Sequence, residues 1–149
     1  MLIILTLTIL SIGLLIGTEL AVSIFINPVL NRLDERTRAQ AIQMFATRLG
    51  KAMPPWYIAS FVLLLAITWF HRHQSSQSLL IAAGVIWAVV ILLTILFLVP
   101  INNRMMRLDP NSFTEAQQRE HRRWTTLHHL RVASLCVAMV CLLIAILPM

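Results

Sequence analysis

The sequence contains few charged residues. Only 12% of its 149 residues are charged and 58% are hydrophobic, whereas about a quarter of the residues of an average soluble domain are charged. This composition excludes an ordinary soluble domain. The net charge of +6 could suggest nucleic acid, but the 12 Lys and Arg residues lie between long apolar runs. We therefore expect the lipid bilayer to be a partner and nucleic acid not to be one.

Several motifs with known chemistry are also missing. The four glycines form no phosphate-binding loop, no paired-cysteine metal motif occurs, and neither a Ser-His-Asp arrangement nor an internal repeat is evident. Cys136 and Cys141 lie on one apolar stretch, roughly 140° apart around a helix of 3.6 residues per turn, so they cannot bridge within it. We interpret them as packed thiols.

Long apolar runs are abundant instead. A bilayer core of about 30 Å needs roughly 20 apolar residues in a helix, and the runs are continuous rather than alternating, which favours helices over a β-barrel. The sequence predicts an all-α fold, a four-transmembrane-helix bundle with amphipathic cytoplasmic helical segments, formed by a single integral membrane domain over residues 1–149. The expected spans are 2–26, 53–70, 79–99 and 125–147.

The distribution of Lys and Arg predicts the orientation. Five basic residues lie in loop 27–52 and five in loop 100–124, whereas the connection between them has only Arg72. Because basic loops stay inside, we expect both basic loops in the cytoplasm and both termini outside. The ten basic residues are Arg32, Arg36, Arg38, Arg48, Lys51, Arg104, Arg107, Arg119, Arg122 and Arg123.

Both basic loops show helix signals. In the first, Asp34 can cap an amphipathic interfacial helix, with apolar residues at 42, 45, 49 and 53, and Gly50 can end it. In the second basic loop, 100–124, Ser112 and Glu115 have capping-box spacing. No Gly or Pro follows from Phe113 until Pro148. We therefore expect one long helix to start near Phe113 and to cross the membrane.

Two opposite charges are expected at membrane depth, where ionisable groups are costly and tend to be functional. Glu19 precedes Asn27 by eight residues, about 12 Å along a helix, and Arg131 follows Trp124 by seven, about 10 Å. The two charges can therefore lie at similar depth. They can be part of a functional site or a purely structural ion pair.

Helical geometry groups further polar residues with this pair. At 100° per residue, His121, Trp124, His128 and Arg131 share a sector of roughly 80°, whereas His129 points away. Glu19, Ser23, Ile26 and Asn27 share a face of the first span. The sequence predicts a polar pocket among the first, third and fourth spans.

The substrate-binding candidates at this pocket are Asn27, Asn102, Asn103 and Trp124. Each has a plainer interpretation. Trp124 can be an interfacial anchor, and at least one of Asn102 and Asn103 can cap the third span.

A metal site is not expected. His121 and His128 are about 10 Å apart on a helix, too far for one ion, and the adjacent His128 and His129 point apart. We predict no metal; the alternative is an ion near Glu19 and His128, since carboxylate and imidazole suit iron, copper or zinc.

Short motifs resemble those of the anthrone oxygenase-like family of small membrane proteins. They are the segment 17–33 with Pro28, the segment Val99-Pro100-Ile101-Asn102-Asn103, and Trp124 followed by His128-His129-Leu130-Arg131. The resemblance spans nearly the whole chain. It implies a four-helix bundle and, for fungal members, the oxygenation of an anthrone to an anthraquinone without an evident organic cofactor or metal.

The family pattern matches at Pro28, Pro100, Asn102, Trp124, His129 and Arg131, but the family usually has Asn at position 128. Geometry favours His128 and the resemblance favours His129, so both remain candidate bases. The resemblance suggests that Arg131 stabilises an oxyanion, that Asn102 or Asn103 donates hydrogen bonds, and that Glu19 holds Arg131 or shares the proton transfer.

The expected function is therefore that of an oxygenase or oxidoreductase acting on a lipophilic aromatic or quinone-type substrate at the cytoplasmic half of the bundle. Two alternatives remain. The pocket can bind a quinone or another lipophilic molecule without catalysis, or the chain can be a structural subunit of a membrane complex. The structural subunit would contact its partner through a small-residue face such as Gly13 and Gly17. A homo-oligomer is a further possible assembly.

Overall fold

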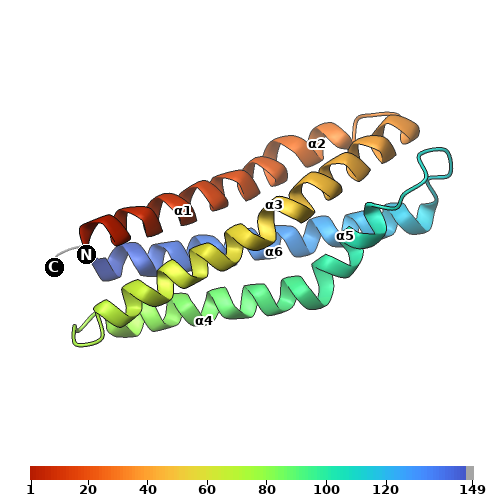
Figure 1. Ribbon diagram of the computed structural model, residues 1–149. Helices are drawn as coiled ribbons and strands as arrows, with labels where there is room; N and C mark the ends of the chain where they lie inside the picture. The colour runs from red at the N-terminus through yellow and green to blue at the C-terminus, as the bar shows by residue number, and fades with distance from the viewer. Residues whose placement is uncertain (147–149) are drawn as a thin grey trace.

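The computed structural model describes residues 1–146 as four long helices packed side by side (Figure 1). The first is made of α1 (Leu2–Ala21), η1 (Val22–Ile26) and α2 (Asn27–Leu30), and the second is α3 (Glu35–Phe70). The third is made of α4 (Gln77–Leu93), η2 (Thr94–Leu98) and α5 (Val99–Met105), and the fourth is α6 (Glu115–Ile146). The described part of the chain has no strand, so the predicted all-α bundle is confirmed.

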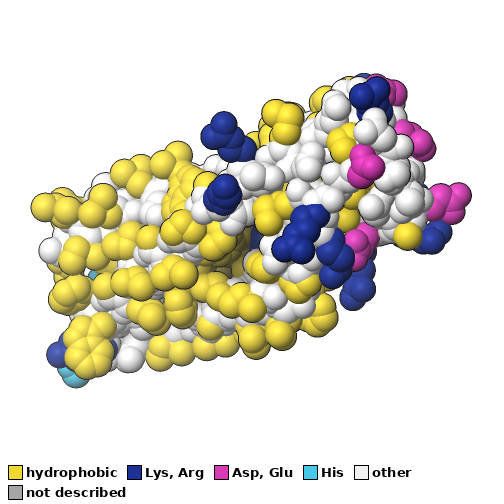
Figure 2. Space-filling model, turned by 45° about the vertical axis from the view of Figure 1, so that its right-hand side comes forward, with side chains coloured by type: hydrophobic (Ala, Val, Ile, Leu, Met, Phe, Trp, Pro, Cys, Tyr) yellow, Lys and Arg dark blue, Asp and Glu magenta, His cyan; other side chains and the backbone are white. Residues whose placement is uncertain are grey.

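Each helix is long and apolar enough to cross a bilayer. Many large hydrophobic side chains are exposed on the outside, among them Leu14, Ile58, Val85 and Val140. Figure 2 shows that they cover most of the length of one face, whereas most Lys, Arg, Asp and Glu side chains gather at one end. Such an apolar belt is stable only in contact with lipid, and the protein is a multi-pass integral membrane protein.

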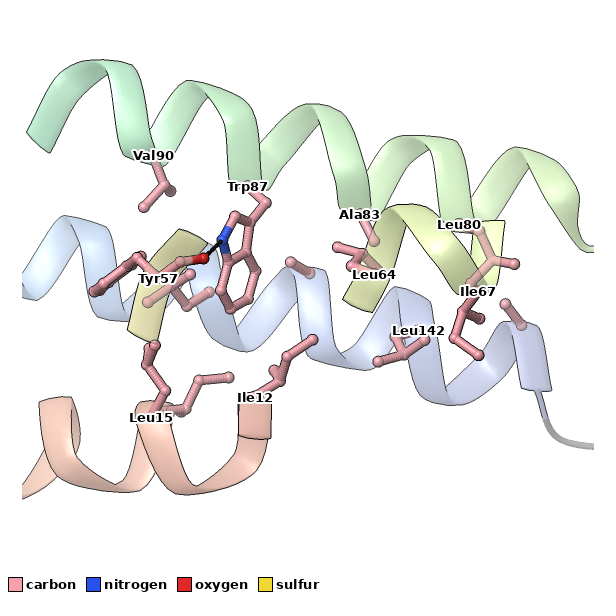
Figure 3. Packing of buried hydrophobic residues seen from close by; sticks show 14 of the residues in the cluster. Ile12, Leu15, Tyr57, Leu64, Ile67, Leu80, Ala83, Trp87, Val90 and Leu142 are labelled. Carbon is pink, nitrogen blue, oxygen red and sulfur yellow. Dashed lines mark hydrogen bonds between the residues drawn. The ribbon is translucent and has the colours of Figure 1, made fainter. Parts of the chain in front are cut away.

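The apolar half of the bundle is held by one hydrophobic core. Trp87, Ile12, Leu64 and Leu142 are fully buried and come from all four helices (Figure 3). The indole Nε1 of Trp87 donates a hydrogen bond of 3.3 Å to the backbone oxygen of Tyr57, which joins α4 to α3. The neighbouring pairs around the bundle are α1 with α3, α3 with α4, α4 with α6, and α6 with α1.

The charged end of the bundle, called the basic end below, carries the turn between α2 and α3 and the loop between α5 and α6. A second cluster of buried residues packs there. Its members are Leu30, Ile42, Ala46, Ile101, Met105 and Leu108. The helices therefore continue as a packed bundle beyond the apolar belt.

Two π-helical segments interrupt the first and third helices. In η1 the N–H of Asn27 bonds to the carbonyl of Val22, and in η2 the N–H of Val99 bonds to the carbonyl of Thr94. Each segment ends shortly before a proline, Pro28 or Pro100. Proline has no N–H to offer the carbonyl four residues earlier, so the chain takes up the wider five-residue bonding locally. Such π-segments are frequent at functional sites.

The two segments also show an internal repeat, contrary to the expectation of none. The pattern Phe-x-x-Pro-x-x-Asn-Arg occurs at 25–32 and again at 97–104. In both places the pattern begins within a π-segment and ends shortly before the connection to a long helix. The repeat was missed because it covers only four identical positions, and its shared consequence is visible only in the backbone.

The expected interfacial helix is not a separate element. The side chain of Asp34 does cap α3 by accepting a hydrogen bond from Thr37 N, but the helix runs through Gly50, Pro54 and Pro55 to Phe70. Gly50 does not adopt a positive φ, so it does not end the helix. Each proline removes only one hydrogen bond, the one to the carbonyl four residues earlier, and packing against neighbouring helices stabilises the rest of α3.

The start of α6 differs by two residues from the prediction. The helix begins at Glu115, and its capping box uses Thr114 and Gln117 rather than Ser112 and Glu115. The Thr114 N–H donates to Gln117 Oε1 at 2.8 Å, and the Gln117 N–H donates to Thr114 Oγ1 at 3.3 Å. The pair Ser112 and Glu115 has the same spacing as the pair Thr114 and Gln117. The hydrogen bond from Asn111 N to Asp109 Oδ1, however, holds the residues before Ser112 in a turn, so the helix begins later.

Candidate functional site

Glu19 on α1 and Arg131 on α6 form a buried ion pair. The guanidinium Nη2 of Arg131 donates a hydrogen bond of 2.6 Å to Glu19 Oε2, and the two side chains are 11% and 2% exposed. A charge in such a place is stable only with a partner. The spacing along each helix predicts that the two groups lie at similar depth, and in the structure they are in direct contact.

His128 completes this cluster. Its Nε2 lies 3.1 Å from the backbone oxygen of Glu19, and because a carbonyl oxygen only accepts, Nε2 carries a hydrogen. Its Nδ1 lies 2.9 Å from Arg131 Nη2 and 3.1 Å from Glu19 Oε2. When Nδ1 carries a lone pair, it accepts a hydrogen bond from Arg131. When Nδ1 carries a proton, it donates a hydrogen bond to Glu19. The ring is therefore placed to gain or lose a proton at Nδ1.

Three aromatic rings of α6 stack along the same face. The ring of Trp124 lies 4.7 Å from that of His128 at an angle of 10°, and 6.1 Å from that of His121 at 7°. The residues are three and four positions apart, so a helix places them above one another. Trp124 therefore fixes the plane of the His128 ring.

A cavity of about 200 Å³, called the main cavity below, adjoins the cluster and is lined by Glu19, His128 and Arg131 together with Trp124 and mostly apolar side chains. It extends along the bundle toward Asn102 and Asn103 at the basic end. Ile58 of α3 and Ile95 of η2 line it and are also exposed on the outer face. Part of the cavity wall is therefore formed by residues that also face lipid.

A second cavity, of about 40 Å³, adjoins the first, and Trp124 is among the residues that line both. Asn27 and His121 line this small cavity, and the Asn27 Nδ2 and His121 Nε2 atoms have no hydrogen-bond partner there. Asn27 does not line the main cavity. A space of this size with two polar atoms suits water.

The remaining candidates are divided between the cavity and the surface. Asn102 lines the main cavity, and its Nδ2 donates a hydrogen bond of 3.2 Å to the backbone oxygen of Ala46. Asn103 lines it while remaining exposed. His129 does not: it is exposed on the outside of α6, its ring 6.4 Å from that of His128. Of the two candidate bases, only His128 lines the main cavity.

Sequence reasoning missed the hydroxyl residues of the main cavity, among them Tyr57 and Thr94. Tyr57 of α3 is 5% exposed, lines the cavity, and lies under the Arg131 guanidinium, whose Cζ is 5.4 Å from the ring centre. Thr94 of η2 also lines the cavity. One signal was available, because Tyr57 is the only tyrosine of the chain and lies in an apolar span.

The ligands for a metal ion are few. Among the described residues, no group of three or more His, Cys, Asp and Glu side chains is close enough to hold an ion. Glu19 and His128 supply two donors, and the Arg131 guanidinium bonds to both of them. Its positive charge opposes a cation at the position considered as an alternative.

Comparison with known proteins gave a family match. The family model described as anthrone oxygenase matches residues 42–141, more than half of the chain. The match includes Tyr57, Asn102, Trp124, His128 and Arg131, whereas Glu19 and the segment 17–33 precede it. Neither the comparison with curated proteins nor that with solved structures gave a match. The chain belongs to the anthrone oxygenase family.

Proposed function

We propose that this protein is a membrane oxygenase that acts on a lipophilic polycyclic aromatic substrate of the anthrone type. The observation that carries the proposal is the Glu19, His128 and Arg131 cluster at the wall of an otherwise apolar cavity. Family membership points to an oxygenase-like role. A cavity wall formed partly by lipid-facing residues fits a substrate dissolved in the membrane.

The reaction requires a base, a cation and an apolar space. Removal of one proton from the activated CH₂ group of an anthrone gives an anion whose charge is shared with the carbonyl oxygen. The carbanion carbon adds O₂, and protonation gives a hydroperoxide. Loss of the second C–H proton then forms the C=O bond while the O–O bond breaks, and water leaves. Anthrone and O₂ thus yield anthraquinone and water, with no other oxidant.

His128 is the proposed base and Arg131 the proposed oxyanion partner. With a lone pair at Nδ1, His128 accepts a hydrogen bond from Arg131. When Arg131 turns its donors toward the developing oxyanion, Nδ1 becomes free to take the proton. The new Nδ1–H can then donate to Glu19 Oε2, which lies 3.1 Å away. Base activation and oxyanion binding are therefore coupled through one guanidinium group.

Other residues of the main cavity hold the substrate. Trp124 contributes an apolar ring to the cavity wall, against which an aromatic substrate can pack. Asn102 and Asn103 provide polar groups at the basic end, and the Arg131 Nε has no partner in the protein, leaving a donor for the substrate. In the proposed orientation this end of the cavity lies in the cytoplasmic half of the membrane.

The test compares two adjacent histidines. Purified wild type, His128→Gln and His129→Gln are given an anthrone in aerobic detergent solution, and anthraquinone formation and oxygen uptake are measured above spontaneous oxidation. Loss of a general base costs about 10²-fold to 10⁴-fold, so His128→Gln should fall to the background rate. His129→Gln is the matched control and should keep near wild-type turnover.

Three results would contradict the proposal in different ways. Unchanged turnover of His128→Gln would rule out this base. Wild-type protein that binds the anthrone without oxidising it would favour the non-catalytic ligand-binding alternative. Wild-type protein that neither binds nor oxidises the anthrone would favour the structural-subunit alternative.

A further inference from the structure

One threonine of the main cavity differs from most helical threonines of the bundle. Seven of them donate their hydroxyl hydrogen to the backbone oxygen four residues earlier, as is common for threonine in apolar helices. Thr94, the first residue of η2, does not: its Oγ1 is buried, has no hydrogen-bond partner and belongs to a residue of the main-cavity wall. The seven are Thr6, Thr8, Thr18, Thr47, Thr68, Thr125 and Thr126.

Tyr57 provides a second free hydroxyl in the same cavity. Its ring is fixed by Arg131 at 5.4 Å and by Trp87, whose ring centre lies 6.0 Å away (Figure 3). The hydroxyl oxygen is buried; it lies near the Glu19 carboxylate but makes no hydrogen bond to it or to any other described residue. The ring is thus well packed, while its one polar atom is not hydrogen-bonded.

Two such hydroxyls in one cavity call for a common explanation. Buried polar groups are almost always hydrogen-bonded, and leaving one unpaired is costly where no water replaces the partner. Here both belong to different helices and line the same otherwise apolar space. An acceptor carried by a ligand would satisfy both hydroxyls without any change in the fold.

We propose that Tyr57 and Thr94 form a hydroxyl subsite that donates hydrogen bonds to oxygen atoms of the ligand. This deepens the proposed function, since it rests on the main cavity being the ligand site. Within the aromatic class already proposed, it requires a ligand that carries a carbonyl or phenolic oxygen. A plain aromatic hydrocarbon or a lipid chain would leave both hydroxyls unpaired and is therefore discriminated against.

The chain contains a matched control for this subsite. Thr18 lines the same cavity, but its hydroxyl already donates to the backbone oxygen of Leu14 at 2.9 Å. Thr18→Val therefore removes a satisfied hydroxyl, whereas Thr94→Val removes an unsatisfied one by the same change in shape. Tyr57→Phe removes the other unsatisfied hydroxyl and keeps the ring.

The experiment measures the affinity of the purified full chain for anthraquinone and for anthracene, which share a three-ring shape and differ in oxygen. Partition into empty detergent micelles is measured separately and subtracted. A hydrogen bond is worth about 0.5–1.5 kcal/mol net, or roughly two- to tenfold in affinity. Tyr57→Phe and Thr94→Val should each reduce the preference for anthraquinone by about that factor, with anthracene binding and Thr18→Val unchanged.

Thermal unfolding of the same variants gives a second readout. Because neither hydroxyl has a partner in the protein, Tyr57→Phe and Thr94→Val should unfold at the wild-type temperature or above it. A lower unfolding temperature in both would show that the hydroxyls are bonded within the protein and would overturn the subsite. So would an unchanged preference for anthraquinone in both variants, or no preference in the wild type.

The two proposals fail differently. Binding that depends on Tyr57 and Thr94 without any oxidation of anthrone would leave the subsite standing and remove the oxygenase function. If the wild type oxidises anthrone but Tyr57→Phe and Thr94→Val both keep the preference for anthraquinone, the oxygenase function would stand and the subsite would be removed.

Discussion

Arg131 donates a hydrogen bond of 2.6 Å to Glu19, although 112 residues separate them in the chain. The contact joins the first helix to the last at the wall of the main cavity. It therefore has two consequences, one for the stability of the bundle and one for the chemistry of His128, which contacts both residues.

The first prediction concerns stability. Glu19→Gln and Arg131→Gln should each lower the free energy of unfolding by about 3 kcal/mol, because each leaves a buried charge unpaired. The double variant should be less destabilised than the sum, since both charges are gone. Thermal or denaturant unfolding in one detergent measures all four proteins. Additive losses would show that the pair contributes no coupling.

The second prediction separates stacking from membrane anchoring at Trp124. Trp124→Leu should weaken anthraquinone binding by roughly two- to tenfold, because one aromatic contact is worth about 0.5–1.5 kcal/mol. Trp124→Phe should recover most of it. Trp69 is the control, since it is 65% exposed and does not line the main cavity. Equal effects of Trp124→Leu and Trp69→Leu on binding would favour the anchor interpretation.

The third prediction tests the origin of η2. Pro100→Ala restores an N–H that can bond to the carbonyl of Leu96, so the regular α-helix becomes available again. We expect unchanged or higher thermal stability together with at least a several-fold loss of anthraquinone affinity, since η2 lines the main cavity. Pro55→Ala is the control, because α3 passes Pro55 without a π-segment. Wild-type affinity in Pro100→Ala would refute a role for η2.

The fourth prediction concerns the close approach of α3 and α5. A Cβ at Gly50 would lie 2.5 Å from Asn102 Nδ2, which bonds to the backbone oxygen of Ala46. Gly50→Ala must displace this amide and should cost about 1–3 kcal/mol of stability. In an Asn102→Ala background the amide is absent. There Gly50→Ala should be close to neutral in thermal unfolding, and an equal cost in both backgrounds would contradict the contact.

The fifth prediction is the orientation, which follows from the loop charges alone. Cys136 and Cys141 are replaced by Ala, and single cysteines are placed at Ser75 and Ser112. In intact cells an impermeant maleimide should label the Ser75→Cys protein and not the Ser112→Cys protein until the membrane is opened. The reverse pattern would place the basic end outside.

The sequence determined much of the fold because hydrophobicity acts along each helix separately. Apolar runs of membrane-spanning length predict four helices, and Asp34 does cap α3. The rise and turn of a helix also place His121, Trp124, His128 and Arg131 on one face, where the stacked rings are found. These properties require no knowledge of neighbouring helices.

Other local features are decided by competition between signals of equal strength. Gly50 with Pro54 and Pro55 resembles a helix end, yet α3 continues to Phe70. The capping box uses Thr114 and Gln117 although Ser112 and Glu115 have the same spacing. A local sequence pattern is compatible with several helix ends and caps. Packing against the other helices, and the turn before the helix, determine which of them forms.

Only the tertiary structure decided which polar groups meet at the cavity. The sequence places Glu19 and Arg131 at similar depth, but their contact depends on the rotation of α1 and α6 about their own axes. The same rotations leave His129 outside, place Asn27 at the small cavity, and turn Tyr57 and Thr94 into the main cavity. Rotation and neighbour choice are set by side-chain packing across helices, which no periodicity along one helix contains.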